Sequence, residues 1–273
     1  MSRAYRHQLN GSDVERGKVQ LEAEGVSLSF GAVKALSGVS IKVRQGDIHA
    51  IIGPNGAGKT SLLNCTSGLY RPQQGSIRLL DGKVRELTRT RPSRIATWGV
   101  ARTFQNIELF RHMSVLDNLL LGRHVHMRHN LLNALVYVGA GRRQEIEHRE
   151  LVEEVIDFLE LQAVRKLEVG RLAYGLQKRV ELGRALCMQP AILLLDEPMA
   201  GMNAEERESM ARYMLDVNEL AGVTTVLIEH DMGVVMDISN RVTVLDFGNV
   251  IADGTPDEVA EEPQVVKAYL GEQ

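Results

Sequence analysis

The chain has 273 residues, 25% of them charged, and a formal net charge of only -3. This length allows one large α/β domain with an inserted subdomain, and the near-neutral charge argues against a polyanion-binding surface, so nucleic acid is not an expected partner. No apolar run reaches the roughly 20 residues that a membrane-spanning helix requires. The polar start, residues 1–18, lacks the apolar core of a secretory signal and is predicted to be a loose tail on a protein of the cytoplasm.

The first strands are predicted from apolar alternation. Every second residue is apolar in two early segments, which include Val26, Leu28 and Phe30 and then Ile41 and Val43. Half-buried strands have this period, so we predict an antiparallel β element here.

Three later runs are apolar without alternation and end in polar residues: 49–52, 191–195 and 224–228. Strands that are buried on both faces have this pattern, so the runs predict a parallel sheet core. Between the first two runs, residues 106–175 have apolar residues at helical spacing, which predicts an inserted helical subdomain.

One later helix has both of its ends marked in the sequence. Asn203 is followed three residues on by Glu206, which predicts a capping box at the start of the helix. Gly222 predicts its end.

A glycine-rich loop lies between the first apolar run and a helical segment that begins near Ser61. Eight residues fit the pattern G-x-x-x-x-G-K-[ST]: Gly53, Pro54, Asn55, Gly56, Ala57, Gly58, Lys59 and Thr60. The glycines let main-chain N–H groups converge on phosphate oxygens at the positive end of a helix. We expect Lys59 to reach the β- and γ-phosphates of ATP, the Thr60 hydroxyl to ligate Mg²⁺, and Ser61 to belong to the same nucleotide-binding site.

Two carboxylates follow the second apolar run. Asp196 and Glu197 are predicted at the carboxyl end of a buried strand, where open α/β sheets place ligand-binding groups. Asp196 is predicted to hold magnesium, directly or through water, and Glu197 to accept a proton from the attacking water. Alone, such a pair is more often a solvated turn; the phosphate loop in the same chain favours catalysis.

The order of these motifs resembles that of the ABC ATPase family from Leu28 onward. The resemblance implies an α/β P-loop NTPase (RecA-like) core with an antiparallel β element and an inserted helical subdomain, forming one ABC ATPase domain over residues 19–273. It also implies that Gln105, in Ala-Arg-Thr-Phe-Gln, is the Q-loop glutamine, which touches magnesium and couples the catalytic site to membrane subunits. His230 looks like the switch histidine, a second catalytic residue that contacts the γ-phosphate and helps to position water.

Two further segments match nucleotide-contacting positions of that family. Phe30 lies where these ATPases stack an aromatic ring on adenine. The signature segment is Leu-Ala-Tyr-Gly-Leu-Gln in place of Leu-Ser-Gly-Gly-Gln, with Ala173, Tyr174, Gly175 and Leu176 at its centre. In the family this segment binds ATP held by the opposite subunit, so Ala173, Tyr174 and Gly175 are expected to contact nucleotide, although Ala173 has no hydroxyl group.

The same signature, with Phe247-Gly248 and Tyr269-Leu270-Gly271, resembles the larger ATPase of branched-chain amino acid importers. This implies ATP hydrolysis that drives import at the cytoplasmic face of the inner membrane. The implied partners are two transmembrane permease subunits, a companion ABC ATPase in a heterodimer and, indirectly, a periplasmic substrate-binding protein. The ATPase of a lipid or lipopolysaccharide exporter is one alternative. A soluble ABC switch protein is another, although such proteins resemble tandem cassettes or carry long coiled coils.

Two groups of residues suggest other chemistry but have an ordinary explanation. Four histidines invite a metal site, yet they lie in a polar stretch where a solvated face is expected: His112, His124, His126 and His129. Cys65 and Cys187 lie far apart in apolar helical segments, which predicts two reduced, buried thiols.

Overall fold

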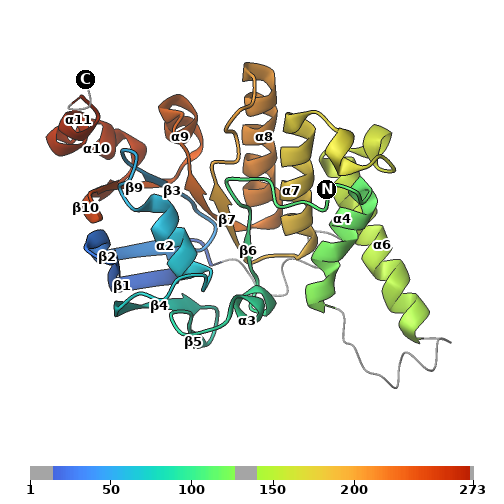
Figure 1. Ribbon diagram of the computed structural model, residues 1–273, viewed down its shortest axis with the longest axis horizontal. Helices are drawn as coiled ribbons and strands as arrows, with labels where there is room; N and C mark the ends of the chain where they lie inside the picture. Colours follow the sequence, from blue (N-terminus) through green and yellow to red (C-terminus); the bar gives the residue numbers. More distant parts are fainter. Residues whose placement is uncertain (1–14, 127–139, 271–273) are drawn as a thin grey trace.

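Two β-sheets organise the part of the chain that the computed structural model describes, residues 15–126 and 140–270 (Figure 1). The antiparallel sheet has the strand order β2 (Val33–Arg44), β1 (Val19–Phe30), β4 (Gln74–Leu80) and β5 (Val84–Glu86). The second sheet has the order β10 (Asn249–Gly254), β9 (Arg241–Asp246), β3 (Ile48–Ile52), β8 (Thr224–Ile228), β7 (Ile192–Asp196) and β6 (Val100–Arg102). Its neighbouring strands are parallel except for the β9–β10 hairpin.

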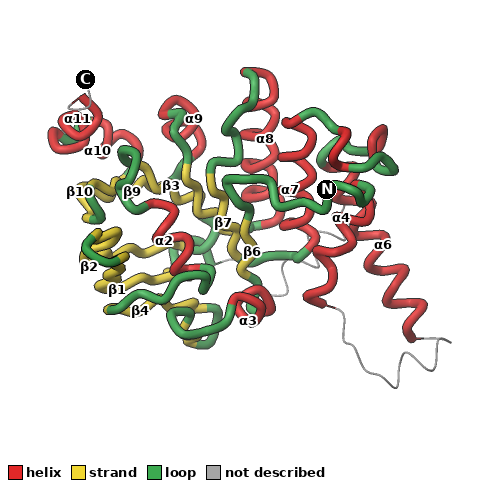
Figure 2. Tube along the Cα trace, viewed as in Figure 1, coloured by secondary structure: helices red, strands yellow, loops and turns green. Residues whose placement is uncertain are grey.

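Figure 2 shows α2 between the two sheets, whereas α4, α6, α7 and α8 lie on the side of the second sheet away from the antiparallel sheet. The α-helices are α2 (Lys59–Thr66), α3 (Pro92–Thr97), α4 (Val115–Gly122), α6 (Ala140–Phe158), α7 (Tyr174–Cys187), α8 (Ala204–Ala221), α9 (Met232–Ile238), α10 (Pro256–Ala260) and α11 (Pro263–Leu270). The 3₁₀ turns in the described ranges are η1 (Arg123–His126), η2 (Gln162–Val164) and η3 (Val169–Arg171). In Figure 1, α4, α6, α7 and α8 lie together beyond β6 and β7.

The parallel strands are apolar on both faces because each face covers a different part of the core. Leu193 and Leu195 of β7 pack with the helical cluster of α4, α6, α7 and α8. Leu194 points the other way, into the layer that holds α2 and the antiparallel sheet. Complete burial of each such side chain contributes about 1.5–3 kcal/mol. The prediction of strands buried on both faces is thereby confirmed.

The other predicted segments can be compared with the observed elements. The early alternating residues form β1 and β2, which pair antiparallel as predicted. Residues 106–175 hold α4, η1, α6, η2, η3 and the start of α7. β1 begins at Val19, and residues 1–14 of the predicted polar tail lie outside the described residues. Within the described ranges, no helix combines the length and the apolar character needed to cross a bilayer.

The predicted capping box is present at the start of α8. The Asn203 side chain accepts a hydrogen bond from the Glu206 N–H at 3.0 Å, and the Glu206 carboxylate accepts one from the Asn203 N–H at 3.1 Å. Gly222 ends the helix with φ 65°, a conformation that favours glycine.

Candidate active site

The glycine-rich loop connects β3, which is buried along its whole length, to α2. Two of its glycines lie where another chain segment approaches the backbone. A Cβ added to Gly53 (φ 143°) would lie 1.9 Å from the carbonyl O of Leu245, and one added to Gly58 (φ 102°) would lie 2.3 Å from that of Ala35. Glycine is therefore required by packing as well as by conformation.

Lys59 begins α2 and is folded against the loop. Its Nζ donates hydrogen bonds to the carbonyl O of Gly53 at 2.6 Å and of Pro54 at 2.8 Å, and the residue is 6% exposed. A buried ammonium group at a helix N-terminus makes this loop electropositive, which suits a polyphosphate.

The Asp196 carboxylate is held between two partners. The Thr60 hydroxyl donates to Oδ1 at 3.3 Å, and Arg102 Nη2 donates to Oδ2 at 3.0 Å. The side chains of Asp196 and Arg102 are 1% and 7% exposed, so this is a buried ion pair. Burial raises the pKa of Asp196 and the Arg102 guanidinium opposes that rise. Thr60 Oγ1 and Asp196 Oδ1 form a pair of hard oxygen donors, the kind that Mg²⁺ prefers.

Arg102, in β6, was not identified as a site residue from the sequence. In addition to the bond from Nη2 to Asp196, Nη1 of Arg102 donates to Asn64 Oδ1 at 2.7 Å and to Ser67 Oγ at 2.8 Å. Asn64 lies in α2 and Ser67 caps the end of that helix. The guanidinium also lies 5.1 Å from the centre of the Phe104 ring. An arginine in a short strand that pairs with a buried strand is the one signal that could have marked it.

Gln105 and His230, two of the predicted site residues, both contact Glu197. His230 Nε2 lies 2.6 Å from Glu197 Oε1, and Gln105 Nε2 donates to Glu197 Oε2 at 3.1 Å. The Glu197 side chain is 14% exposed, and its backbone has φ 49°, a strained value for a non-glycine residue. Strain of this kind is concentrated at functional sites. Three residues that the sequence assigns to one site, Gln105, Glu197 and His230, are thus in contact in the structure.

Glu229, which is buried and was not identified from the sequence, binds the main chain of His230. Glu229 accepts hydrogen bonds from the main-chain N–H of Met199 at 2.8 Å and of His230 at 3.1 Å. Burial raises its pKa, and the two N–H donors oppose that rise. Glu229 thereby joins the loop after Glu197 to the loop that carries His230.

Phe30 lies at the end of β1 and is 49% exposed. Tyr70 contacts it edge to face, with 5.2 Å between ring centres and 74° between ring planes. An exposed aromatic face suits stacking on a nucleobase, while the second ring limits the orientations that Phe30 can adopt.

The signature segment packs against the start of α8 in this chain. Ala173 precedes the first turn of α7, and Tyr174 begins that helix. A Cβ added to Gly201 would lie 3.1 Å from the Tyr174 ring, and one added to Gly175 would lie 2.2 Å from Oε1 of Glu206. Both glycines therefore allow a close approach.

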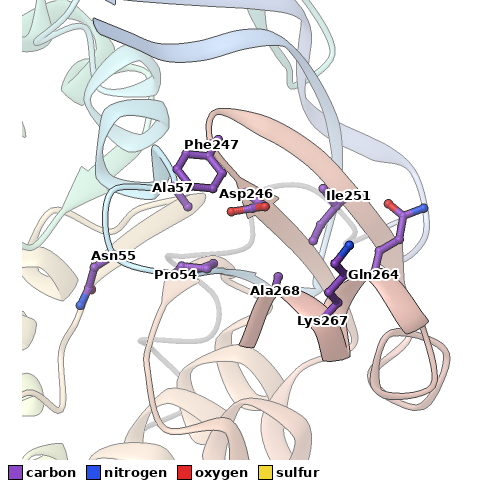
Figure 3. Close-up of a pocket in the computed structure, with 9 residues that line it drawn as sticks. All are labelled: Pro54, Asn55, Ala57, Asp246, Phe247, Ile251, Gln264, Lys267 and Ala268. Atoms are coloured by element: carbon purple, nitrogen blue, oxygen red, sulfur yellow. The ribbon is translucent and has the colours of Figure 1, made fainter. Parts of the chain in front are cut away.

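A pocket of about 540 Å³ is lined in part by the glycine-rich loop (Figure 3). Pro54, Asn55 and Ala57 form one wall, and Phe247 and Lys267, from the β9–β10 turn and α11, form part of the rest. The turn supports the loop directly, because the Gly248 N–H donates to the Ala57 carbonyl O at 3.0 Å. The catalytic cluster around Glu197 does not line this pocket.

The histidines and cysteines hold no additional site in the described part of the chain. No group of three or more His, Cys, Asp or Glu residues there could hold a metal ion, and His129 lies outside it. His126 Nε2 lies 2.7 Å from the Met188 carbonyl O. Both cysteines are buried and free, as predicted. Burial raises the pKa of Cys65 to about 11 and that of Cys187 to about 12.

A parallel sheet, a glycine-rich loop at a helix N-terminus after β3, and adjacent carboxylates at the end of β7, two strands away in the same sheet, define a P-loop NTPase. Comparison with known proteins identifies the family of this chain within that class. The ABC transporter family model matches residues 36–200, and the model of the branched-chain amino acid ATP-binding cassette transporter matches residues 249–273.

Two relatives are similar over nearly the whole chain. The high-affinity branched-chain amino acid transport ATP-binding protein BraF of Pseudomonas aeruginosa is 42% identical, and LivG of Salmonella typhimurium is 39% identical. Each match covers 92% of this chain and 98% of the relative. A solved ATP-binding cassette of an ABC transporter, in its ADP conformation, is 32% identical with a TM-score of 0.78, covering 93% of this chain and 99% of that one.

The chain therefore belongs to the ABC transporter family, in the group of ATP-binding proteins of branched-chain amino acid transport. Proteins of this family are ATPases that couple ATP hydrolysis to transport, and the predicted family, fold and enzyme class are confirmed.

Proposed function

We propose that this chain hydrolyses ATP at the site built on Lys59, Asp196 and Glu197 to drive the import of branched-chain amino acids. The names of its relatives supply the substrate class. The roles of the individual residues rest on the geometry. The glycine-rich loop and Lys59 hold the phosphates, Phe30 stacks on adenine, and Ser61 extends the binding site along α2.

The contact between Glu197, Gln105 and His230 carries this proposal. A general base must lie within hydrogen-bond reach of the group that it deprotonates and must be held in orientation. Here both oxygens of Glu197 have a partner, one on the loop after β6 and one on the loop after β8. These contacts support the role of Glu197 as the base that accepts a proton from water; in this proposal His230 contacts the γ-phosphate.

The test replaces Glu197 with glutamine in the assembled transporter. We expect Glu197→Gln to bind ATP with nearly unchanged affinity and to lose about a hundredfold or more in turnover, the scale for a positioned general base. Glu208→Gln, an exposed glutamate on the neighbouring helix α8, is the matched control and should retain full turnover. Wild-type turnover in Glu197→Gln would reject this assignment.

Thr60 Oγ1 and Asp196 Oδ1 would hold a magnesium ion, and Gln105 would be a further ligand. An ion held there would supply positive charge to neutralise the charge that develops on the transferred phosphoryl group. The residues of the chain supply the orientation. Arg102 occupies one oxygen of Asp196 and leaves Oδ1 directed towards Thr60.

The partners that we propose are two transmembrane permease subunits, which hold the chain at the cytoplasmic face of the membrane, and a companion ABC ATPase. A periplasmic substrate-binding protein would act through the permeases. Phe110, five residues after Gln105, is 58% exposed, so the segment that contains Gln105 presents an apolar group for a permease contact. A cysteine at position 110 should cross-link to a permease. A cysteine at position 84, an exposed position in β5 of the antiparallel sheet, is the control, and equal cross-linking there would reject this contact.

A further inference from the structure

The inner face of α7, the helix that begins at the signature segment, carries two buried charges. The side chains of Lys178 and Glu181 are each 2% exposed, and Nζ of the lysine lies 3.7 Å from Oε2 of the glutamate. Burial raises the pKa of Glu181, and Lys178 opposes that rise. The core around these residues is otherwise apolar, with Val180 and Leu182 on the same helix.

Both charged groups bind the main chain of the Q-loop, the segment 104–108. Lys178 Nζ donates to the Gln105 carbonyl O at 3.0 Å and lies 3.5 Å from that of Phe104. The Phe104 N–H donates to Glu181 Oε1 at 3.3 Å, and the Glu108 N–H also faces this carboxylate. One turn further along α7, Arg184 donates to the Glu108 carbonyl O at 2.5 Å. One helix thus binds the Q-loop backbone at both ends of the segment.

The Q-loop in turn contacts the catalytic base. The same Gln105 whose carbonyl O binds Lys178 donates from its side chain to Glu197 Oε2. At the other end, the Lys178 ammonium lies 5.9 Å from the centre of the Tyr174 ring, in the signature segment. A continuous set of contacts therefore joins the signature segment of this subunit to its own Glu197.

Stability alone does not account for a buried ion pair at this place. Desolvation of two charges largely cancels their attraction, and apolar residues of similar volume are often as stable or more stable. The pair does provide hydrogen-bond partners of the correct polarity for an irregular main-chain segment, whose buried N–H and C=O groups must be satisfied. Lysine meets the carbonyl groups and glutamate meets the N–H groups.

We propose that Lys178 and Glu181 are positioning residues that make the signature helix and the Q-loop move as one unit. A displacement of α7, such as one caused when the companion's nucleotide binds the signature segment, then moves Gln105 relative to Glu197. The nucleotide state of one site is thereby transmitted to the catalytic base of the other. This inference rests on the proposed roles of Gln105 and Glu197.

The first experiment removes the polar contacts while it keeps the core filled. In the assembled transporter, Lys178→Met/Glu181→Leu should lower kcat about tenfold and leave the KM for ATP within about twofold, because the misplaced Gln105 no longer aligns Glu197 in the transition state while ATP binding is retained. In the isolated full chain, amide hydrogen exchange over residues 104–108 should become faster than in the parent protein, because these main-chain groups lose their partners. The control replaces an exposed ion pair on α6, with Arg149→Met/Glu145→Leu, and should alter neither property.

The second experiment separates a positioning role from a merely structural one. Gln105→Ala is combined with the double substitution in a mutant cycle. If the pair acts through Gln105, the double substitution causes no further loss of kcat in the Gln105→Ala background. Additive losses, or unchanged exchange over 104–108, would overturn the inference. If Gln105→Ala alone leaves kcat intact, the proposed role of Gln105 fails instead, and the two failures are distinguishable.

Should the apolar variant fail to fold, the exchanged pair Lys178→Glu/Glu181→Lys provides an independent test. It keeps both charges and their attraction but reverses their polarity towards the Q-loop backbone. We expect the same faster exchange and the same loss of kcat. An exchanged pair that folds with wild-type kcat would show that the ion pair stabilises the helix only, and would overturn the proposal.

Discussion

The ion pair between Arg102 and Asp196 provides the sharpest test of how the site is held. Arg102→Met keeps most of the side-chain volume but removes the guanidinium from a carboxylate that is 1% exposed. Breaking a buried pair by removing one partner destabilises a protein by about 3–5 kcal/mol, because the remaining charge is uncompensated. Three hydrogen bonds of the guanidinium, to Asp196, Asn64 and Ser67, are lost together. We therefore expect the free energy of unfolding, measured in urea, to fall by about this amount.

Magnesium makes the test specific to the site. In the proposed site, Mg²⁺ with ATP would place positive charge beside Asp196. It should therefore narrow the difference in the free energy of unfolding between Arg102→Met and the parent protein, whereas ATP with a chelator should not. Arg102→Lys keeps the positive charge but lacks the planar guanidinium group. Its free energy of unfolding should therefore lie between those of Arg102→Met and the parent protein. Arg149→Met, at an exposed position, should change stability by less than about 0.5 kcal/mol. The reasoning would be refuted if Arg102→Met changed the free energy of unfolding by less than about 0.5 kcal/mol. It would also be refuted if the stability difference from the parent protein were the same with and without Mg²⁺.

Three further predictions concern the rest of the chain. Lys59→Ala should abolish ATP binding, since the phosphate-directed charge disappears; unchanged binding by calorimetry would contradict the loop assignment. The isolated chain should hydrolyse ATP slowly until companion and permeases are added, because each site needs a signature segment from a second subunit; brisk hydrolysis by the isolated chain would count against this. Burial lowers the pKa of His49 from 6.5 to about 4, so from pH 6.5 to pH 4 only the unfolded chain binds this proton. Stability should therefore fall on acidification by about 1.4 kcal/mol per pH unit from this residue, a dependence that His49→Gln should lack in urea titrations at pH 7, 6 and 5.

Features encoded by neighbouring residues could be predicted from the sequence. The glycine-rich loop, the pair of carboxylates after β7 and the capping box of α8 each lie within a few consecutive positions, and the structure has them where the sequence indicates. Alternation along 26–30 and its absence along 224–228 likewise distinguish a half-buried strand from one buried on both faces. Local spacing reports local conformation and burial, so these elements needed no tertiary information.

The contacts that orient the site could not be predicted, because they join segments that are remote in sequence. Arg102 and Asp196 are 94 positions apart, and Lys178 and Gln105 are 73 apart. A charged residue in an apolar segment indicates that a partner exists but does not say which one. Only the register of β6 beside β7, and the packing of α7 on the Q-loop, bring these particular groups together.

The altered signature segment is accommodated by the fold, which bears on how it would bind the companion's nucleotide. Tyr174 packs its ring against Gly201, so the larger residue has a place within its own subunit. Ala173 precedes α7 and has no side-chain oxygen to cap the helix, so the N–H groups of the first turn are not occupied by that residue. A serine there would bind one of these groups and add a hydroxyl for the phosphate. With alanine, the proposed recognition of the companion's γ-phosphate would rest on main-chain N–H groups at the positive end of a 14-residue helix. The loss of one charged hydrogen bond, about 1.5–3 kcal/mol, would then be offset in part by donors that the fold leaves in place.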